Sequence, residues 1–118
     1  MTLNHLNLQV GDAAEMAAFL VEHFGFAVAL EKPDHSIIAL QGDGFDLVLQ
    51  QAGGGAPAYP PGFHFGFILA HRELVEATHA RLRRAGVAVD GEIGRSRRGS
   101  QFFLTAPGGL RMEVGCHG

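Results

Sequence analysis

The stretch FHFGFIL, residues 63–69, has the alternation of a β-strand that is buried on one face. Its apolar face consists of Phe63, Phe65, Phe67 and Leu69. The opposite face carries His64 beside Gly66, which has no side chain and leaves space next to the imidazole. An imidazole on a strand whose other face belongs to the core is a candidate functional group.

The same pattern occurs near the N-terminus, in LNHLNLQV, residues 3–10. There Leu6, Leu8 and Val10 form the apolar face, and His5, Asn7 and Gln9 form the other. A histidine stands early in both strands. We therefore interpret the chain as two copies of one structural unit.

The order of the other predicted elements supports this repeat. In the first copy, a helix over 13–24, capped by Asp12 and ended by Gly25, precedes strands at 26–31, 35–41 and 45–51. In the second copy, a helix over 72–85 precedes strands at 87–90, 101–105 and 110–115. Residues 53–62 are rich in Gly and Pro and form the predicted linker. Module one thus covers about 1–52 and module two covers 63–118.

Composition limits the class of protein. A chain of 118 residues with 47% hydrophobic and 18% charged residues is expected to form one globular domain, here 1–118. The formal charge of −3 argues against nucleic acid as a partner. The single cysteine, Cys116, fits a reducing compartment, and no apolar run approaches the roughly 18 residues that span a membrane. We expect a cytoplasmic protein without a membrane partner.

A tandem βαβββ order with a histidine early in each first strand resembles the vicinal oxygen chelate superfamily. That superfamily includes glyoxalase I, bleomycin-resistance proteins, fosfomycin-resistance thiol transferases, methylmalonyl-CoA epimerase and extradiol dioxygenases. Further local similarity lies in HLNLQVGD (5–12), RLRRAGVAV (81–89) and APGGLRMEVG (106–115). The resemblance implies an α+β fold in which each module curls a mixed sheet into a half-barrel. Two such half-barrels would enclose a metal and substrate cavity.

The resemblance also implies a ligand set. It places the last strand beside the strand of His64, which brings Glu113 near that imidazole. His5, His64 and Glu113 would then hold a divalent Fe, Mn, Ni, Co or Zn ion with positions left open for substrate, and Glu113 is the candidate catalytic carboxylate. The alternative is that the histidines are hydrogen-bonded structural residues and that Glu113 is solvated.

A fourth ligand is not expected. Aligning the hairpin glycines Gly44 and Gly109 sets Val48 opposite Glu113, and a valine cannot bind a metal. Glyoxalase I, which the chain resembles, has a glutamate there, and the epimerase a glutamine. Gln50 or Asp46 would replace it only if the register were shifted by two residues. Glyoxalase I is therefore disfavoured, and dioxygenases are disfavoured because the only tyrosine, Tyr59, lies in the linker.

Several polar residues are candidates for substrate contacts. Arg111 shares the predicted cavity face with Glu113, although it could instead pair with Asp46. The cluster at 95–100 is either a solvated loop or an anion clamp that uses Arg95 and Arg98. Asn7 and Gln50 complete the candidates. The remaining histidines, which we expect to be exposed, are His23, His35, His71, His79 and His117. The terminal pair of Cys116 and His117 could bind a metal weakly, but we expect it to fray.

Two functions remain open. The first is a metal-dependent lyase, isomerase, thiol transferase or dioxygenase that acts on a small chelating, anionic substrate. The second is a metal-free protein that sequesters a small molecule or antibiotic, as bleomycin-resistance proteins do. The resemblance further implies a homodimer, because relatives cover the apolar edges of their half-barrels by pairing subunits.

Overall fold

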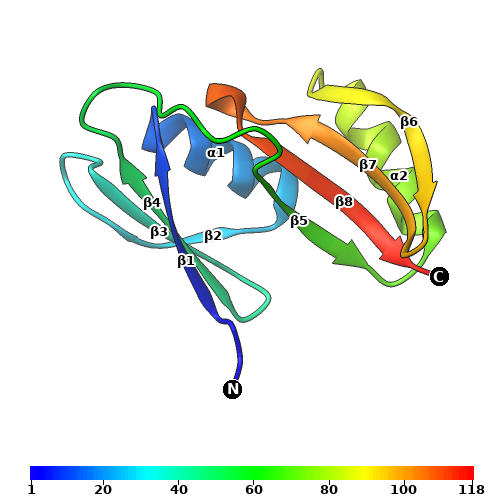
Figure 1. Cartoon of the computed structure of the whole chain (residues 1–118). Helices are drawn as coiled ribbons and strands as arrows, with labels where there is room; N and C mark the ends of the chain where they lie inside the picture. Colours follow the sequence, from blue (N-terminus) through cyan, green and yellow to red (C-terminus); the bar gives the residue numbers. More distant parts are fainter. The chain divides into compact units, whose positions relative to one another are not determined.

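A computed structural model describes residues 1–118 as two compact units, Met1–Ala58 and Tyr59–Gly118. Each unit consists of one α-helix and one four-stranded mixed sheet, in the chain order βαβββ (Figure 1). The predicted α+β fold with a tandem repeat is confirmed. The treatment of residues 1–118 as a single domain stays a prediction.

The first unit consists of β1 (His5–Val10), α1 (Ala13–Phe24), β2 (Ala27–Glu31), β3 (Ile37–Gly42) and β4 (Phe45–Gln51). Its strand order is β1-β4-β3-β2, with β1 parallel to β4 and the other neighbours antiparallel. Helix α1 contacts β2, β3 and β4, and the side chains beneath it are buried. The other face of the sheet carries His5, Asn7 and Gln9 on β1.

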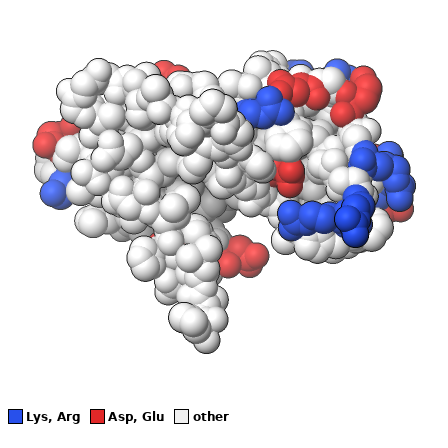
Figure 2. All heavy atoms as spheres, in the orientation of Figure 1, with Lys and Arg blue, Asp and Glu red and all other residues white.

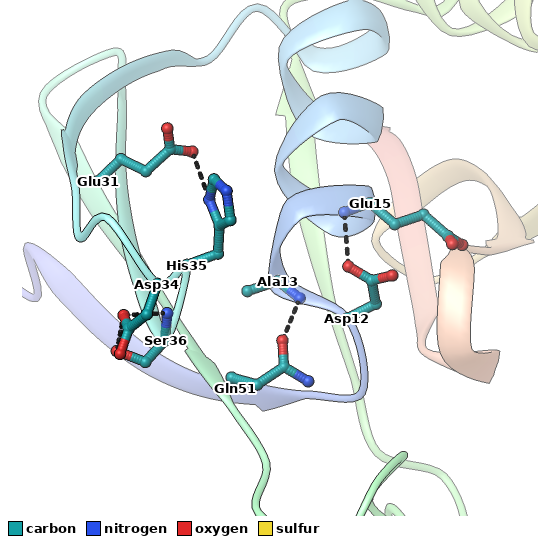
Figure 3. A network of polar contacts seen from close by, with 8 residues as sticks. All are labelled: Asp12, Ala13, Glu15, Glu31, Asp34, His35, Ser36 and Gln51. Atoms are coloured by element: carbon teal, nitrogen blue, oxygen red, sulfur yellow. Dashed lines mark hydrogen bonds and ion pairs between the residues drawn. The ribbon is translucent and has the colours of Figure 1, made fainter.

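The start of α1 is held by two polar contacts, which Figure 3 shows. The Asp12 carboxylate accepts a hydrogen bond from the Glu15 amide at 3.0 Å, as the predicted cap requires. The Ala13 amide donates to the Gln51 side chain of β4 at 2.9 Å. The helix ends at Gly25, whose φ of 74° is left-handed. These contacts fix the helix against the end of β4.

The second unit consists of β5 (His64–Leu69), α2 (Arg72–Arg84), β6 (Ala88–Ser96), β7 (Gly99–Thr105), a 3₁₀ turn (Pro107–Gly109) and β8 (Arg111–His117). Its strand order is β5-β8-β7-β6, and β5 runs parallel to β8 as expected. Helix α2 contacts all four strands. The core beneath it includes Phe102, Leu104, Met112 and Val114.

The predicted ends of two strands are wrong in this unit. Strand β6 continues to Ser96, beyond an irregularity between Asp90 and Gly94, because Gly94 and Arg95 pair with β7. Strand β8 continues to His117, and Cys116 is buried rather than frayed because it pairs with Ser100. The arginine cluster is consequently part of a β-hairpin and not an open loop.

Two expectations about the helices are also corrected. His79 is only 6% exposed, because its ring lies edge-on to Phe102 and its Nε2 atom donates to the Gly91 carbonyl at 2.8 Å. The spacing of Met16, Phe19, Leu20 and Phe24 predicts that these four side chains form the buried stripe of α1. The buried residues are instead Ala13, Met16, Ala17 and Leu20, and Phe19 and Phe24 are only half-buried. Neither helix has the length and apolar character to cross a membrane.

Candidate metal and substrate site

The site lies on the sheet face of the second unit that α2 does not cover. The strand register arranges this face in rows that cross β5, β8, β7 and β6. The first two rows hold His64, Arg111, Thr105 and Ala88, and then Gly66, Glu113, Phe103 and Asp90. The next rows hold Ile68, Gly115, Gln101 and Gly94, and then His117, Gly99 and Ser96. Successive rows are about 7 Å apart because each step covers two residues of a strand.

His64 and Glu113 face each other in the first two rows. The Nε2 atom of His64 lies 4.0 Å from Oε2 of Glu113, and the side chains are 41% and 31% exposed. On its other side, the His64 Nδ1 atom donates to the Gly62 carbonyl at 2.8 Å. The ring also lies edge-on to Phe103. Since Nδ1 carries a proton in this bond, the nitrogen directed toward the carboxylate is Nε2, which carries the lone pair in the neutral ring.

Gly66 allows β5 to lie close to the Glu113 backbone of β8. A Cβ atom at this position would lie 2.6 Å from the Glu113 carbonyl oxygen and 3.0 Å from the Glu113 Cβ atom. Real Cβ atoms do not approach backbone oxygen so closely, so any side chain here would displace β8. The glycine noted in the sequence therefore keeps His64 and Glu113 in register.

The positive charge of Arg111 is balanced by Asp90, a carboxylate that the sequence did not predict as its partner. Its guanidinium lies 3.0 Å from Oδ2 of Asp90 and 4.6 Å from the centre of the Phe103 ring. The alternative partner, Asp46, instead accepts a hydrogen bond from Gln41 at 3.0 Å. Hydrophobic alternation gives no signal for the Arg111–Asp90 pair, because Asp90 lies two strands away on β6.

A cavity of about 550 Å³ opens along this face, within the range of small-molecule sites. Its lining includes the pair His64 and Glu113, the apolar Phe67 and Ile68, the glycines Gly66 and Gly115, and the polar Ser96, Arg98, Gln101 and His117. Arg111 and Arg95 are not among the lining residues. Of the predicted arginines, only Arg98 reaches the cavity.

Arg98 stands in the turn between β6 and β7, at the far end of the cavity from Glu113. Its Nη2 atom lies 3.4 Å from the Nε2 atom of His117, and its amide donates to the Ser96 hydroxyl at 3.2 Å. The ion pairs of this unit's arginines involve Arg72, Arg83 and Arg111, so Arg98 has no carboxylate partner. His117, which we had expected to fray, is a lining residue that sequence reasoning missed.

The first unit carries the equivalent face without a carboxylate at the register position of Glu113. His5 aligns with Asp46, Asn7 with Val48 and Gln9 with Gln50. In the second unit His64 aligns with Arg111 and Gly66 with Glu113, so Val48 is the register equivalent of Glu113. The exposed His5 imidazole contacts the Asn4 side chain through Nδ1 at 2.8 Å, which leaves Nε2 open as in His64.

The predicted ligands thus divide between the units, with His5 in the first and His64 and Glu113 in the second. Asn7 and Gln50 are in the first unit, and Arg95, Arg98 and Arg111 in the second. No group of three or more His, Cys, Asp and Glu side chains is clustered for metal binding. The structure brings together two of the predicted ligands.

Charge is distributed unequally along the chain. Residues 1–58 contain one lysine and seven carboxylates, whereas residues 59–118 contain eight arginines and five carboxylates. In Figure 2 the basic atoms gather over the unit that contains α2 and β6.

At the beginning of the second unit, Tyr59 stacks on Phe63 with the ring centres 5.6 Å apart, and burial raises the pKa of the Tyr59 hydroxyl. Neither ring lines the cavity.

Comparison with known proteins identifies similar sequences and folds. The family model described as the glyoxalase/bleomycin resistance protein/dioxygenase superfamily matches residues 2–114. A possible glyoxalase from Bacillus cereus is 30% identical, with 98% of this chain and 99% of that chain covered and a TM-score of 0.85. A comparison with curated proteins gives no match.

Two more distant structures share the fold alone. Lactoylglutathione lyase from Agrobacterium tumefaciens is 20% identical, with 98% of this chain and 92% of that chain covered and a TM-score of 0.81. A genomically encoded fosfomycin resistance protein from Listeria monocytogenes is 18% identical, with coverage of 100% and 94% and a TM-score of 0.81.

Proposed function

Because the chain belongs to the glyoxalase/bleomycin resistance protein/dioxygenase superfamily, we propose that it is an enzyme whose His64 and Glu113 hold a divalent metal ion. The observation that carries the proposal is the orientation of His64. Its Nδ1 atom donates to the Gly62 carbonyl, and its Nε2 atom faces the Glu113 carboxylate at 4.0 Å. Metal-binding histidines are typically fixed by such a bond from their second nitrogen.

The donor geometry fits a metal ion after a small adjustment. With bonds of about 2.1 Å, two neighbouring ligand atoms of one ion would lie roughly 3–3.4 Å apart. His64 Nε2 and Glu113 Oε2 would therefore approach each other by about 1 Å or less from their present 4.0 Å. Both side chains are partly exposed, so a rotation of either χ angle supplies this movement. Imidazole and carboxylate together suit Fe, Mn, Co, Ni or Zn.

His5 is the proposed third ligand. It occupies in β1 the position that His64 occupies in β5, and its Nδ1 atom is likewise engaged, by Asn4. With Val48 in the place of Glu113, the first unit offers one ligand and the second offers two. Three protein ligands would leave open positions for a substrate with two neighbouring oxygen atoms.

When bound, such an ion would polarise a substrate oxygen and stabilise the negative charge that develops on it. The chain's own residues perform the remaining tasks. Phe103 contacts the His64 ring and limits its movement, and Gly66 leaves Glu113 in place. Glu113 is the only carboxylate among the residues that line the cavity, so it is the proposed base for a proton on the substrate. The reaction class we propose is lyase, isomerase, thiol transferase or dioxygenase chemistry on a small anion.

A metal-free binding protein is the second candidate, located in the cytoplasm as the first would be. It is favoured by the absence of a three-donor cluster among His, Cys, Asp and Glu side chains. In that case the cavity of about 550 Å³ would sequester a small molecule without transforming it. The two candidates differ in whether the purified protein contains a stoichiometric metal ion.

Elemental analysis of the purified chain separates these candidates. We expect about one divalent ion per chain, and most of it lost in His64→Ala while the circular dichroism spectrum is unchanged. The matched control is His71→Ala, because His71 is exposed, pairs with Glu73 and lies outside the cavity. Equal metal content in His64→Ala and the native chain would refute the ligand assignment. A chain that never retains or takes up metal would favour the binding protein.

We also propose a homodimer, on the resemblance together with one structural observation. Strand β2 is at the edge of its sheet, and its Val28 and Leu30 side chains are 51% and 60% exposed. An exposed apolar edge strand is prone to pair with another chain. Light scattering should give twice the mass of the chain, and Leu30→Lys should reduce it. A monomer at every concentration would refute the proposal.

A further inference from the structure

We infer that Arg98, together with His117, binds the anionic end of an elongated substrate whose other end reaches His64 and Glu113. The inference rests on the proposed function for its metal-binding end. It differs from an anion site at Arg111, whose charge is already balanced by Asp90 at 3.0 Å. The cation that remains in the cavity is Arg98.

The contacts of Arg98 leave most of its donors free. One nitrogen, Nη2, lies 3.4 Å from the neutral acceptor of His117, and no carboxylate pairs with the guanidinium. A guanidinium has five N–H donors in a planar fork that matches two oxygens of a carboxylate, phosphonate or phosphate. Arg98 is exposed, and its contact with His117 places one edge of this fork at the cavity wall.

The strand geometry sets the length of the ligand. Glu113 and His117 lie on the same face of β8, four residues apart, which corresponds to about 14 Å between their Cα atoms. The row between them contains Gly115 on β8 and Gly94 on β6, and we call it the glycine row. The floor of the cavity therefore has no side chain on β8 or β6 in this row. A rod-like ligand fits lengthwise over this row.

The middle of the path is apolar on its β5 side. Ile68, in the same row as Gly115, is 60% exposed, although its neighbours Phe67 and Leu69 are partly buried. An exposed isoleucine in a cavity favours contact with hydrocarbon. The substrate class is therefore a chelating head, an apolar middle and a carboxylate, phosphonate or phosphate tail.

Two hydroxamates test the inference by calorimetry on Mn(II)-loaded protein. Suberic acid monohydroxamate has a chelating head and a distant carboxylate, and octanohydroxamic acid is its uncharged counterpart. We expect the carboxylate to tighten binding about tenfold in the native chain, which corresponds to about 1.4 kcal/mol. In Arg98→Gln this difference should vanish while the affinity for octanohydroxamic acid is unchanged.

The matched control is Arg97→Gln, since Arg97 is the exposed neighbour in the same turn and does not line the cavity. It should keep the tenfold difference. Succinic acid monohydroxamate is too short to span the glycine row, and its affinity should not depend on Arg98. Equal affinities of the two long hydroxamates for the native chain would overturn the inference.

If the protein binds no Mn(II), the proposed metal site is not tested by the hydroxamates, and the anion site at Arg98 is tested without metal. Methylphosphonate titrated into the metal-free protein, followed by amide NMR shifts, then serves as the probe. Weaker binding in Arg98→Gln than in Arg97→Gln supports an anion site at Arg98, and equal binding in both variants overturns it.

Discussion

The guanidinium of Arg111 lies 3.0 Å from the Asp90 carboxylate and 4.6 Å from the centre of the Phe103 ring. These contacts join β8, β7 and β6 across the face that carries His64 and Glu113. Phe103 contacts both Arg111 and His64. We therefore treat Arg111 as a residue that supports the position of the candidate ligands, and not as one that binds the substrate anion.

Arg111→Gln should lower the free energy of unfolding by about 1 kcal/mol or less, because both partners are almost half exposed and solvent screens the pair. Asp90→Asn should have a similar effect, and the double variant should cost less than the sum. Urea denaturation measures all three. The affinity for suberic acid monohydroxamate should stay within about twofold of native in Arg111→Gln. A loss as large as that of Arg98→Gln would contradict this role.

Gly66→Ala should disturb the candidate site more than its size suggests. The added Cβ would lie 2.6 Å from the Glu113 carbonyl oxygen, so β5 and β8 must separate locally. We expect a loss of about 1–3 kcal/mol in stability, as for other overpacked sites, together with weaker metal binding. Gly53→Ala is the control, because a Cβ there meets nothing within 4 Å. A Gly66→Ala protein with native metal affinity would argue against the register as the cause.

Val48→Glu should give the first unit a carboxylate at the position equivalent to Glu113. Val48 aligns with Asn7 in β1, as Glu113 aligns with Gly66 in β5. The new carboxylate would stand relative to His5 as Glu113 stands relative to His64. Metal affinity should rise about tenfold over the control Val48→Leu, whose side chain cannot bind a metal. A lower melting temperature with no gain in affinity would show a desolvated carboxylate that reaches no ion.

The turn before β3 offers a pH test that is independent of the site (Figure 3). The Ser36 amide and hydroxyl donate to Asp34 Oδ1 at 3.0 and 2.7 Å, and these bonds lower the pKa of Asp34 below 3.8. They therefore stabilise the fold above the unfolded pKa, and the stabilisation is lost as pH falls through the folded pKa.

Ser36→Ala should move the pKa of Asp34 part of the way back up, since the backbone bond, which is the larger cause, remains. Carbon-detected NMR titration of the carboxyl measures this value. The destabilisation should be present near neutral pH and absent at strongly acidic pH. Ser36→Thr, which keeps the hydroxyl, should behave as the native chain. A pKa that does not change in Ser36→Ala would contradict the assignment of the hydroxyl bond.

The sequence predicted the fold because strong periodic signals coincide with it. Hydrophobic alternation in LNHLNLQV and FHFGFIL predicted the first strand of each repeat. Asp12 and Gly25 predicted the two ends of the helix in the first repeat. The equivalence of Val48 and Glu113 followed from the hairpin glycines and agrees with the strand registers. Each of these features is local, or is repeated in the second copy.

Features that depend on long-range pairing were missed. The end of β6 has no hydrophobic alternation in GEIGRS, and only its pairing with Gln101 and Ser100 makes it a strand. His117 is ordered by Gly99 in the same way. His79 did have a signal, because it lies four residues after Val75 and three before Leu82, both of which are buried. A histidine that lies within the apolar stripe of a helix is therefore expected to be buried with it.

The central claim is that His64 and Glu113 hold the same metal ion. The most direct measurement is a double-mutant cycle of Zn(II) affinity, by competition with a chromophoric chelator, on the native chain, His64→Ala, Glu113→Gln and the double variant. We predict that each single variant loses on the order of 100-fold in affinity and that the double variant loses little more than the weaker single one. Losses that multiply independently, or single variants that bind Zn(II) as the native chain does, would contradict the claim.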